Sequence, residues 1–268
     1  MDGILLQRSE FTVLLDAVQA SGVVGLPREA FPREPDKFRA LVLDGISRLQ
    51  ARGLLRKQAN INVLNSDLLA MAATVGHPQL AVLTTREVSG AAPQLYVHYE
   101  TAGLVVEQTF PEEQAHRLVA LSNRGMLIER LTAIVAPPSK NGQPGVVATV
   151  PQAALAEAKA RAEEDEAAAA IAALTKAGLA AAAAKSLVES FQAPAASSAM
   201  VLMQCREGQV TASRNAALVQ GPAATWLITP AEPESAGYVV QTADAAKLAG
   251  LLRKWMLELA PPAPRVLG

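Results

Sequence analysis

The side chains with the most chemical potential in this sequence lie on one predicted strand, where Tyr96, His98 and Glu100 alternate with apolar residues. Alternate residues of a strand point to one face of a sheet, so this spacing places a phenol, an imidazole and a carboxylate side by side. Such a trio could form a ligand pocket or supply a general base. One hypothesis is therefore a small-molecule enzyme or sensor centred on these residues. The alternative is the solvated or half-covered face of a sheet.

The two other histidines have structural interpretations. His77 lies between a glycine and a proline, where a helix is expected to end, and this position favours capping over catalysis. His116 follows Glu112 and Glu113 at the spacing of one helical turn, which could bring an imidazole and a carboxylate together. Because no third ligand is identifiable, we interpret this group as an exposed, charged helix face and predict no metal site.

Signatures of common enzyme classes are missing from the sequence. It has no phosphate-binding loop, dinucleotide-binding glycine turn, zinc-protease helix or hydrolase nucleophile elbow. Aromatic residues make up 4% of the chain, which argues against a surface that stacks on single strands or sugars. With 24 basic against 25 acidic side chains, the composition also argues against a nucleic-acid partner. We predict a protein with no catalytic residue and no cofactor.

Cysteine usage and the N-terminus indicate the compartment. Cys205 is the one cysteine, so an internal disulfide and a cysteine-based zinc site are excluded. Its apolar neighbours predict a buried thiol with a raised pKa, and Trp226 and Trp255 are predicted core anchors. The N-terminus lacks the apolar stretch of a signal peptide, and no run reaches the length of a membrane span. These features predict a cytoplasmic protein.

The elements that position these residues change character along the chain. Apolar residues at helical spacing predict three helices before residue 76, and alternating apolar residues then predict three antiparallel strands between residues 80 and 106. Pro111, followed by two glutamates, predicts the start of another helix that runs through Leu118 and Leu121. Turn-forming residues after this helix predict a linker.

The second half of the sequence repeats this order, with alanine-rich helices, apolar strands and a final helix from Ala243 to Leu259. We therefore predict an α+β fold of two pseudo-repeated units, each with helices, short antiparallel strands and a closing helix. The order of elements leaves open whether the units form one body or two domains. The predicted segments are an N-terminal α+β half (1–136), a linker (137–150), an alanine-rich helical insert (151–191), a C-terminal α+β half (192–260) and a flexible tail (261–268).

The alanine-rich region contains the acidic run Glu163–Glu166, which we interpret as solvated, and Gly178, where a helical hairpin is expected to break. Its stripes of alanine allow helices to approach closely. The region is expected to pack internally or against a partner helix, and it could form the seam of a homodimer.

Three local patterns accompany this order of parts. They are Ala51–Leu55 at the end of a helix, Leu95–Tyr99 before Leu104–Val106, and Thr225–Pro230 before Tyr238–Thr242 and a final helix. Together with the two successive units, they resemble the EspG-like chaperones of type VII secretion. The resemblance spans most of residues 36–259, and the alanine-rich insert departs from it most.

This resemblance implies a non-enzymatic adaptor that holds a helical secretion substrate through its sheet face and loops, and keeps apolar helix tips from aggregating. By this analogy, the loops Ser89–Gln94 and Glu232–Ala236 contact the partner protein. The candidate partner-binding residues are Ser89, Gln94, Tyr96, His98, Glu100, Glu232 and Ser235.

A further alternative concerns the N-terminal helices. The helix that ends near Gly53 and leads into a basic segment resembles the part of a winged helix where a helix precedes a two-stranded wing. Four cations, Arg48, Arg52, Arg56 and Lys57, would then contact DNA phosphates. The polar, uncharged stretch of residues 60–65 makes a poor basic wing, which argues against a DNA-binding regulator.

Overall fold

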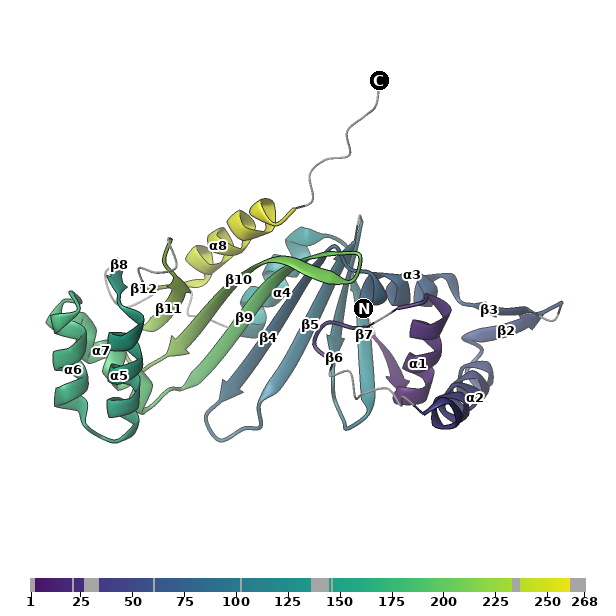
Figure 1. The fold of residues 1–268 in the computed structure, drawn as a ribbon, viewed down its shortest axis with the longest axis horizontal. Helices are drawn as coiled ribbons and strands as arrows, with labels where there is room; N and C mark the ends of the chain where they lie inside the picture. The colour runs from purple at the N-terminus through teal and green to yellow at the C-terminus, as the bar shows by residue number, and fades with distance from the viewer. Residues whose placement is uncertain are drawn as a thin grey trace, which may run out of the picture.

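The computed structural model describes residues 3–20, 22–26, 34–59, 61–101, 103–135, 145, 147–232 and 237–260. Within these ranges the chain forms one ten-stranded antiparallel sheet, a separate two-stranded ribbon and eight helices (Figure 1). The large sheet is the platform on which the helices pack.

The N-terminal half supplies five neighbouring strands of the sheet. In sheet order these are β1 (Ile4–Gln7), β7 (Ala115–Leu121), β6 (Leu104–Thr109), β5 (Gln94–Thr101) and β4 (Leu80–Val88). Its helices are α1 (Arg8–Ala17), α2 (Pro35–Ala51), α3 (Ser66–Gly76) and α4 (Arg124–Val135). Between α2 and α3, the strands β2 (Leu55–Gln58) and β3 (Ile61–Leu64) form the ribbon.

The C-terminal half supplies the other five strands. In sheet order these are β9 (Ala196–Arg206), β10 (Gln209–Gln220), β11 (Thr225–Pro230), β12 (Tyr238–Thr242) and β8 (Val147–Val150). Its helices are α5 (Gln152–Glu163), α6 (Ala167–Lys176), α7 (Ala181–Gln192) and α8 (Ala245–Glu258).

The two halves join where β4 pairs antiparallel with β9, with Thr84 opposite Met200. From the centre of the sheet outward, the N-terminal half has the strands β4, β5, β6 and β7, and the C-terminal half has β9, β10, β11 and β12. The first strand of each half in the sequence, β1 or β8, lies at the outer edge of the sheet. The halves are thus related by an approximate two-fold arrangement about the β4–β9 pair. The predicted α+β fold with two pseudo-repeated units is confirmed, and both units share one sheet.

Each unit was expected to contain three or four antiparallel strands, and each contributes four in succession to the sheet. The strands β7 and β10 are the two that the sequence patterns did not place. The segment after Pro111 was predicted to be a helix, but Ala115–Leu121 is the strand β7 between β6 and β1. There it buries Leu118 completely, and strand pairing on both sides outweighs the helix-start signals of the sequence. Within the predicted linker, Val147–Val150 forms the edge strand β8. The predicted tail, 261–268, lies outside the described residues.

Several local signals determine where helices begin and end. Asn65 caps α3, as its Oδ1 accepts hydrogen bonds from the amides of Asp67 and Leu68. Gly178 (φ 98°) separates α6 from α7 as predicted. A second break, at Asp165 (φ 61°) inside the acidic run, separates α5 from α6 and was not predicted.

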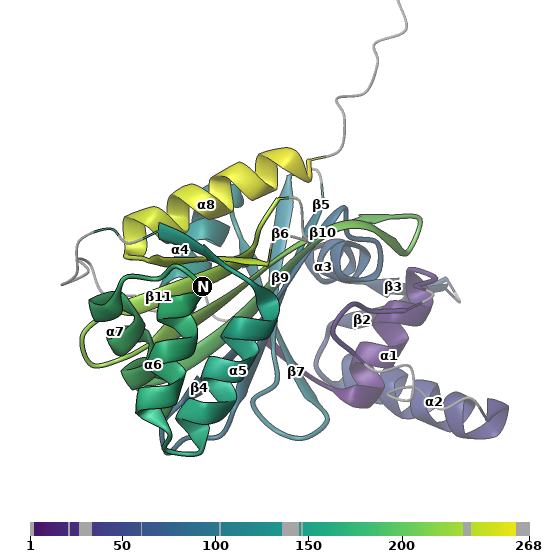
Figure 2. The ribbon, with the colours of Figure 1, turned by 60° about the vertical axis from the view of Figure 1, so that its left-hand side comes forward.

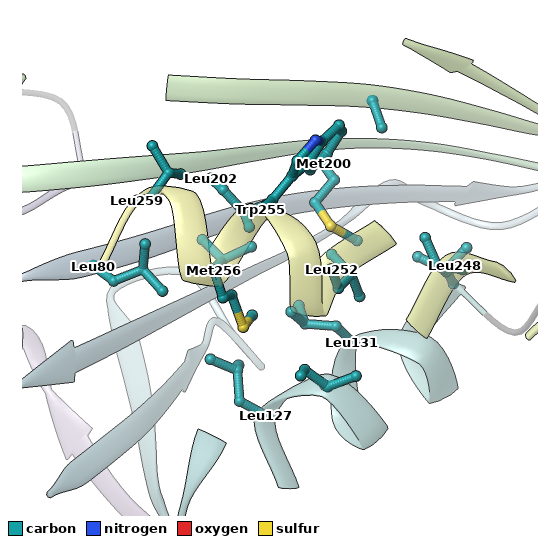
Figure 3. Close-up of a cluster of buried hydrophobic side chains, with 14 of the residues drawn as sticks. Leu80, Leu127, Leu131, Met200, Leu202, Leu248, Leu252, Trp255, Met256 and Leu259 are labelled. Atoms are coloured by element: carbon teal, nitrogen blue, oxygen red, sulfur yellow. The ribbon is translucent and has the colours of Figure 1, made fainter. Parts of the chain in front are cut away.

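Both halves contribute to the core on one face of the sheet, where α4 and α8 lie together (Figure 2). Leu131 of α4 and Leu252 and Trp255 of α8 pack with Met200 and Leu202 of β9 (Figure 3). Trp255 is a core anchor, as predicted. Because this core contains residues from both halves, burial of its apolar side chains stabilises the halves together.

On the opposite face, the helices form two separate layers. The α1–α3 layer packs on the N-terminal end of the sheet around Phe11 and Tyr99, and the α5–α7 layer packs on the C-terminal end around Trp226. Alanines of α5–α7, such as Ala158 and Ala184, are buried inside their own layer. The predicted internal packing of the alanine-rich region is therefore observed.

Candidate partner-binding face

The predicted trio of Tyr96, His98 and Glu100 lies on β5 and faces α4. His98 has no exposed surface, and its Nε2 lies 2.9 Å from Glu107 Oε2 on the neighbouring strand β6. Tyr96 is half-buried, and its hydroxyl donates a hydrogen bond to Gln94 Oε1 at 2.7 Å. The three side chains share a face, as the spacing predicted. His98 is directed at Glu107, however, a contact that the sequence analysis did not predict.

Two arginines of α4 complete this group. Arg130 Nε donates to Glu107 Oε2 at 2.6 Å, and Arg124 Nε donates to Glu100 Oε1 at 2.9 Å. Burial by itself raises the pKa of Glu107, but hydrogen bonds from His98 and Arg130 outweigh burial and lower this pKa to about 2. An ionised carboxylate only accepts hydrogen bonds, so His98 Nε2 carries the proton. These ion pairs and hydrogen bonds therefore join α4 to the sheet. The charged atoms of Arg124 and Arg130 are directed at the carboxylates of Glu100 and Glu107.

Among the described residues, no helix or loop covers the other face of the central strands in the middle of the sheet. Along β9, Met200 and Leu202 are buried on the α4 and α8 side, whereas Ala199 is exposed and Val201 is half-exposed. We call this surface the open face. Its residues on β4, β9 and β10 are mostly small: Thr85, Ser197, Ala199, Val201, Ser213 and Asn215.

The two helical layers bound the open face at its ends (Figure 1). On the N-terminal side, the Val23–Leu26 loop lies over Leu83 and Val97. A Cβ added to Gly25 would lie 2.8 Å from Val97 Cγ2 and 2.9 Å from Leu83 Cδ1. On the C-terminal side, Val219 of β10 packs with the core of the α5–α7 layer. The uncovered strip is therefore the central part of the sheet.

Of the two predicted contact loops, one lies at an end of the open face. Ser89 and Gln94 are both exposed and bracket the turn of the β4–β5 hairpin. The amide of Ser89 donates to the carbonyl of Ala195 at 3.2 Å, which places this hairpin beside the connection from α7 to β9.

The second predicted loop lies elsewhere. Glu232 is exposed, and its Oε1 is 3.8 Å from Nη2 of Arg214, a residue that also pairs with Glu258 of α8. This contact places Glu232 on the α8 side of the sheet, so the structure does not bring it together with Ser89 and Gln94. Ser235 lies outside the described residues.

His116 differs from its prediction. Instead of belonging to an exposed helix face with Glu112 and Glu113, it is buried in β7, with its ring stacked on Phe11 at a centroid separation of 4.3 Å. Its Nδ1 is 2.9 Å from Gln108 Nε2, an amide donor. Burial, assisted by the charge of Arg8, lowers the pKa of His116 to about 4, so the ring is neutral near pH 7.

The remaining candidates have the structural roles that were predicted. Burial raises the pKa of the Cys205 thiol. His77 is the C-cap residue of α3, and its Nε2 lies 2.6 Å from the carbonyl of Val18 at the end of α1. Within the described ranges, no group of three or more His, Cys, Asp or Glu side chains could hold a metal ion. No helix in the same ranges is long and apolar enough to cross a membrane.

The cations of the winged-helix alternative are partly engaged within the chain. Arg48 pairs with Asp44 at 2.8 Å, and Arg52 pairs with the buried Glu10 at 2.8 Å. A two-stranded ribbon does follow α2, as a wing would. Two of the four cations nevertheless have acidic partners inside the protein, which weakens the case for phosphate contacts.

A comparison with solved structures shows which fold this is. The chain is similar to the Mycobacterium tuberculosis type VII secretion system chaperone EspG5, solved in complex with the PE25-PPE41 dimer. The chain has the EspG5 fold. The TM-score is 0.66 over 97% of each chain, at 15% sequence identity. No family model and no curated protein sequence matches it. The resemblance to EspG-like chaperones is thus confirmed at the level of the fold.

Proposed function

We propose that this protein is a non-catalytic, chaperone-like adaptor that binds a protein partner on the open face. The observation that carries the proposal is a strip of small side chains in the middle of the sheet, around Ala199 and Val201, which none of the described elements covers. A sheet face that no element of the same chain covers is a surface on which another protein can pack. The fold of a chaperone solved with a bound protein dimer supports the same function.

We further propose that the partner presents a helix to this face. The strands β4 and β9 are paired on both sides, so they offer a partner no free backbone edge. A partner must therefore bind through side chains, which suits an amphipathic helix laid on a sheet. The small side chains of Thr85, Ala199 and Ser213 would let that helix approach closely. EspG5 was solved with the PE25-PPE41 dimer, and a protein dimer that presents a helix is our candidate partner.

The exposed hairpin residues Ser89 and Gln94 form the rim of the proposed surface, next to the α7–β9 connection. His98 and Glu100 are excluded from it, because they face α4 and bind Glu107 and Arg124. We place the protein in the cytosol as part of this proposal, since its one cysteine is unpaired and buried.

The test is co-purification from the native cell lysate with tagged wild-type protein and an Ala199→Arg variant. The variant places a charge in the middle of the open face, where the native side chain is exposed and the fold should tolerate it. We expect wild type to retain a helical protein at high salt and the variant to lose it. Leu257→Arg is the matched control, because Leu257 is 73% exposed on α8, across the sheet.

Two outcomes would count against this function. Equal recovery of the partner by wild type and Ala199→Arg would remove the open face as the binding surface. Recovery of nucleic acid that is lost at high salt, with no protein partner, would favour the DNA-binding alternative. Circular dichroism of each variant establishes that a loss of binding is not a loss of folding.

A further inference from the structure

The ribbon of β2 and β3 projects from the body as an arm. Leu55 is buried at its base, but on β3 the side chain of Ile61 is 67% exposed and that of Val63 is 41% exposed. Figure 1 shows the arm at the end of the molecule opposite α5–α7. An isolated two-stranded ribbon is marginally stable in water, so an arm with apolar side chains in solvent indicates a missing neighbour.

The arm is not part of the two-fold arrangement of the sheet. The C-terminal half has helices α5–α7 between its edge strand and its four-stranded set, with no ribbon in the described residues there. The large sheet is complete without β2 and β3. The arm therefore needs an explanation outside the internal packing of this chain.

The backbone pairing of the arm shows which groups remain free. The amide of Asn65 donates to the carbonyl of Leu54 at 2.9 Å, and the register continues with Val63 opposite Arg56. In an antiparallel pair, alternate residues direct their amide and carbonyl groups at the partner strand. Val63 and Ile61 therefore bond to β2, whereas the amides and carbonyls of Asn62 and Leu64 point away from the ribbon.

The two edges of the arm differ in charge. The strand β2 carries Arg56 and Lys57, so two copies of it side by side would bring like charges together. The strand β3, with the sequence INVL, has no charged residue and no proline, which are the usual devices that stop an edge from pairing. Among possible occupants, an identical uncharged strand fits this edge without a charge conflict.

We propose that β3 pairs with β3 of a second copy of this chain, in antiparallel register with Val63 opposite Val63 of the second copy. Asn62 and Leu64 then exchange their free backbone bonds with Leu64 and Asn62 of that copy. The result is a four-stranded sheet in the order β2–β3–β3–β2, with the cations on its outer strands and a two-fold axis at its centre. Ile61 and Val63 of both copies gather on one face. The dimer does not depend on the open face, which lies elsewhere on the molecule.

The first test is sedimentation equilibrium of the full chain. Asn62→Pro removes an outward amide and no bond to β2, and Lys57→Pro does the same on the other edge of the ribbon. We expect a concentration-dependent dimer that Lys57→Pro retains and Asn62→Pro weakens about thirtyfold, for two lost hydrogen bonds. A wild-type monomer at every concentration overturns the proposal. So does a dimer that Asn62→Pro leaves intact.

The second test checks the register. Residues that face each other without a hydrogen bond have Cα atoms about 4.5 Å apart, within the range that a disulfide spans. Val63→Cys should therefore form a covalent dimer on mild oxidation, whereas Gln58→Cys on the outer strand should not. The native Cys205 is buried, so it should not form an intermolecular disulfide that would be mistaken for the engineered one. Equal cross-linking of both variants contradicts the proposed pairing.

Discussion

Glu107 is a buried carboxylate held by three hydrogen bonds, one from His98 and two from Arg130, and its position explains how α4 is fixed to the sheet. We expect Arg130→Met to lower the free energy of unfolding by about 2 kcal/mol, because it removes charge-assisted hydrogen bonds from a buried anion. Urea unfolding measures this loss. Arg124→Met is the control, since Glu100 is less buried and its pair should contribute less, about 1 kcal/mol. Equal effects of the two variants would show that burial of the anion is unimportant.

The stability of the protein should fall as the solution becomes mildly acidic. The pKa of His116 is about 4 in the folded protein against 6.5 for the free side chain, so below pH 6.5 protons bind the unfolded chain preferentially. Stability from this group is complete above pH 6.5 and is lost as the pH falls towards 4. His116→Phe keeps the ring stacked on Phe11 and should remove this part of the pH dependence. Urea unfolding between pH 4 and pH 7 tests it.

Glu107 contributes in the same direction at lower pH. Its pKa lies at about 2 instead of 4.5, so its stabilisation is present above pH 4.5 and is lost as the pH falls towards 2. His116→Phe should leave this second decline unchanged. If His116→Phe still lost the full amount of stability between pH 6.5 and pH 4, a group other than His116 would titrate in that range.

At the residue scale, the sequence predicted which side chains share a face but not what they bind. His98 was singled out because strand periodicity places it beside Tyr96 and Glu100. Its partner Glu107 lies nine positions further along, on the next strand, and the hairpin register decides that contact. Arg130 comes from α4, whose packing against this face no local pattern shows. Hydrogen-bonding partners such as Glu107 and Arg130, which only the packing of distant segments brings close, could not be predicted from the sequence.

At the scale of elements, the contact between α1 and α2 depends on one glycine. A Cβ on Gly45 would lie 2.1 Å from the carbonyl oxygen of Ser9, a backbone atom that cannot rotate away. Gly45→Ala should therefore separate the two helices and lower the free energy of unfolding by about 2 kcal/mol or more. Gly250→Ala on α8 is the matched control, because its Cβ meets no atom within 4 Å. It should be neutral or stabilising by up to about 1 kcal/mol. Thermal unfolding of both variants decides the matter.

Helix and strand predictions succeeded where periodicity and end signals agreed, as in α3 with its Asn65 cap. They failed for β7, where Pro111 and two glutamates are typical of a helix start. There the pairing of Ala115–Leu121 with strands on both sides, and the burial of His116 against Phe11, override local preference. The strand β10 was missed because its open-face positions, such as Ser213 and Asn215, are polar and weaken the apolar pattern.

At the scale of the whole molecule, the two halves should unfold together. They share the β4–β9 pair and one core, and Gln220 of β10 donates a hydrogen bond to the carbonyl of Val135 at the end of α4. Trp226 lies in the core of the α5–α7 layer and Trp255 in the core that both halves share, so fluorescence reports on these two cores and far-UV circular dichroism on the entire chain. We expect coincident urea transitions from the two probes. A fluorescence transition separated from the loss of helix and strand would show that the halves are independent.

The two halves of the large sheet have the same order of strands when each is followed from its outer edge to the centre. Each half contributes four successive strands and one edge strand. Two identical five-stranded proteins would build the same sheet by joining along their first long strands. The β4–β9 seam would then be the interface of an ancestral homodimer, made permanent when a duplicated gene joined its subunits. Such an ancestor had to keep both surfaces alike, whereas a fused chain is free to change them separately. In this protein the halves do differ, with a ribbon on one and an alanine-rich helical layer on the other.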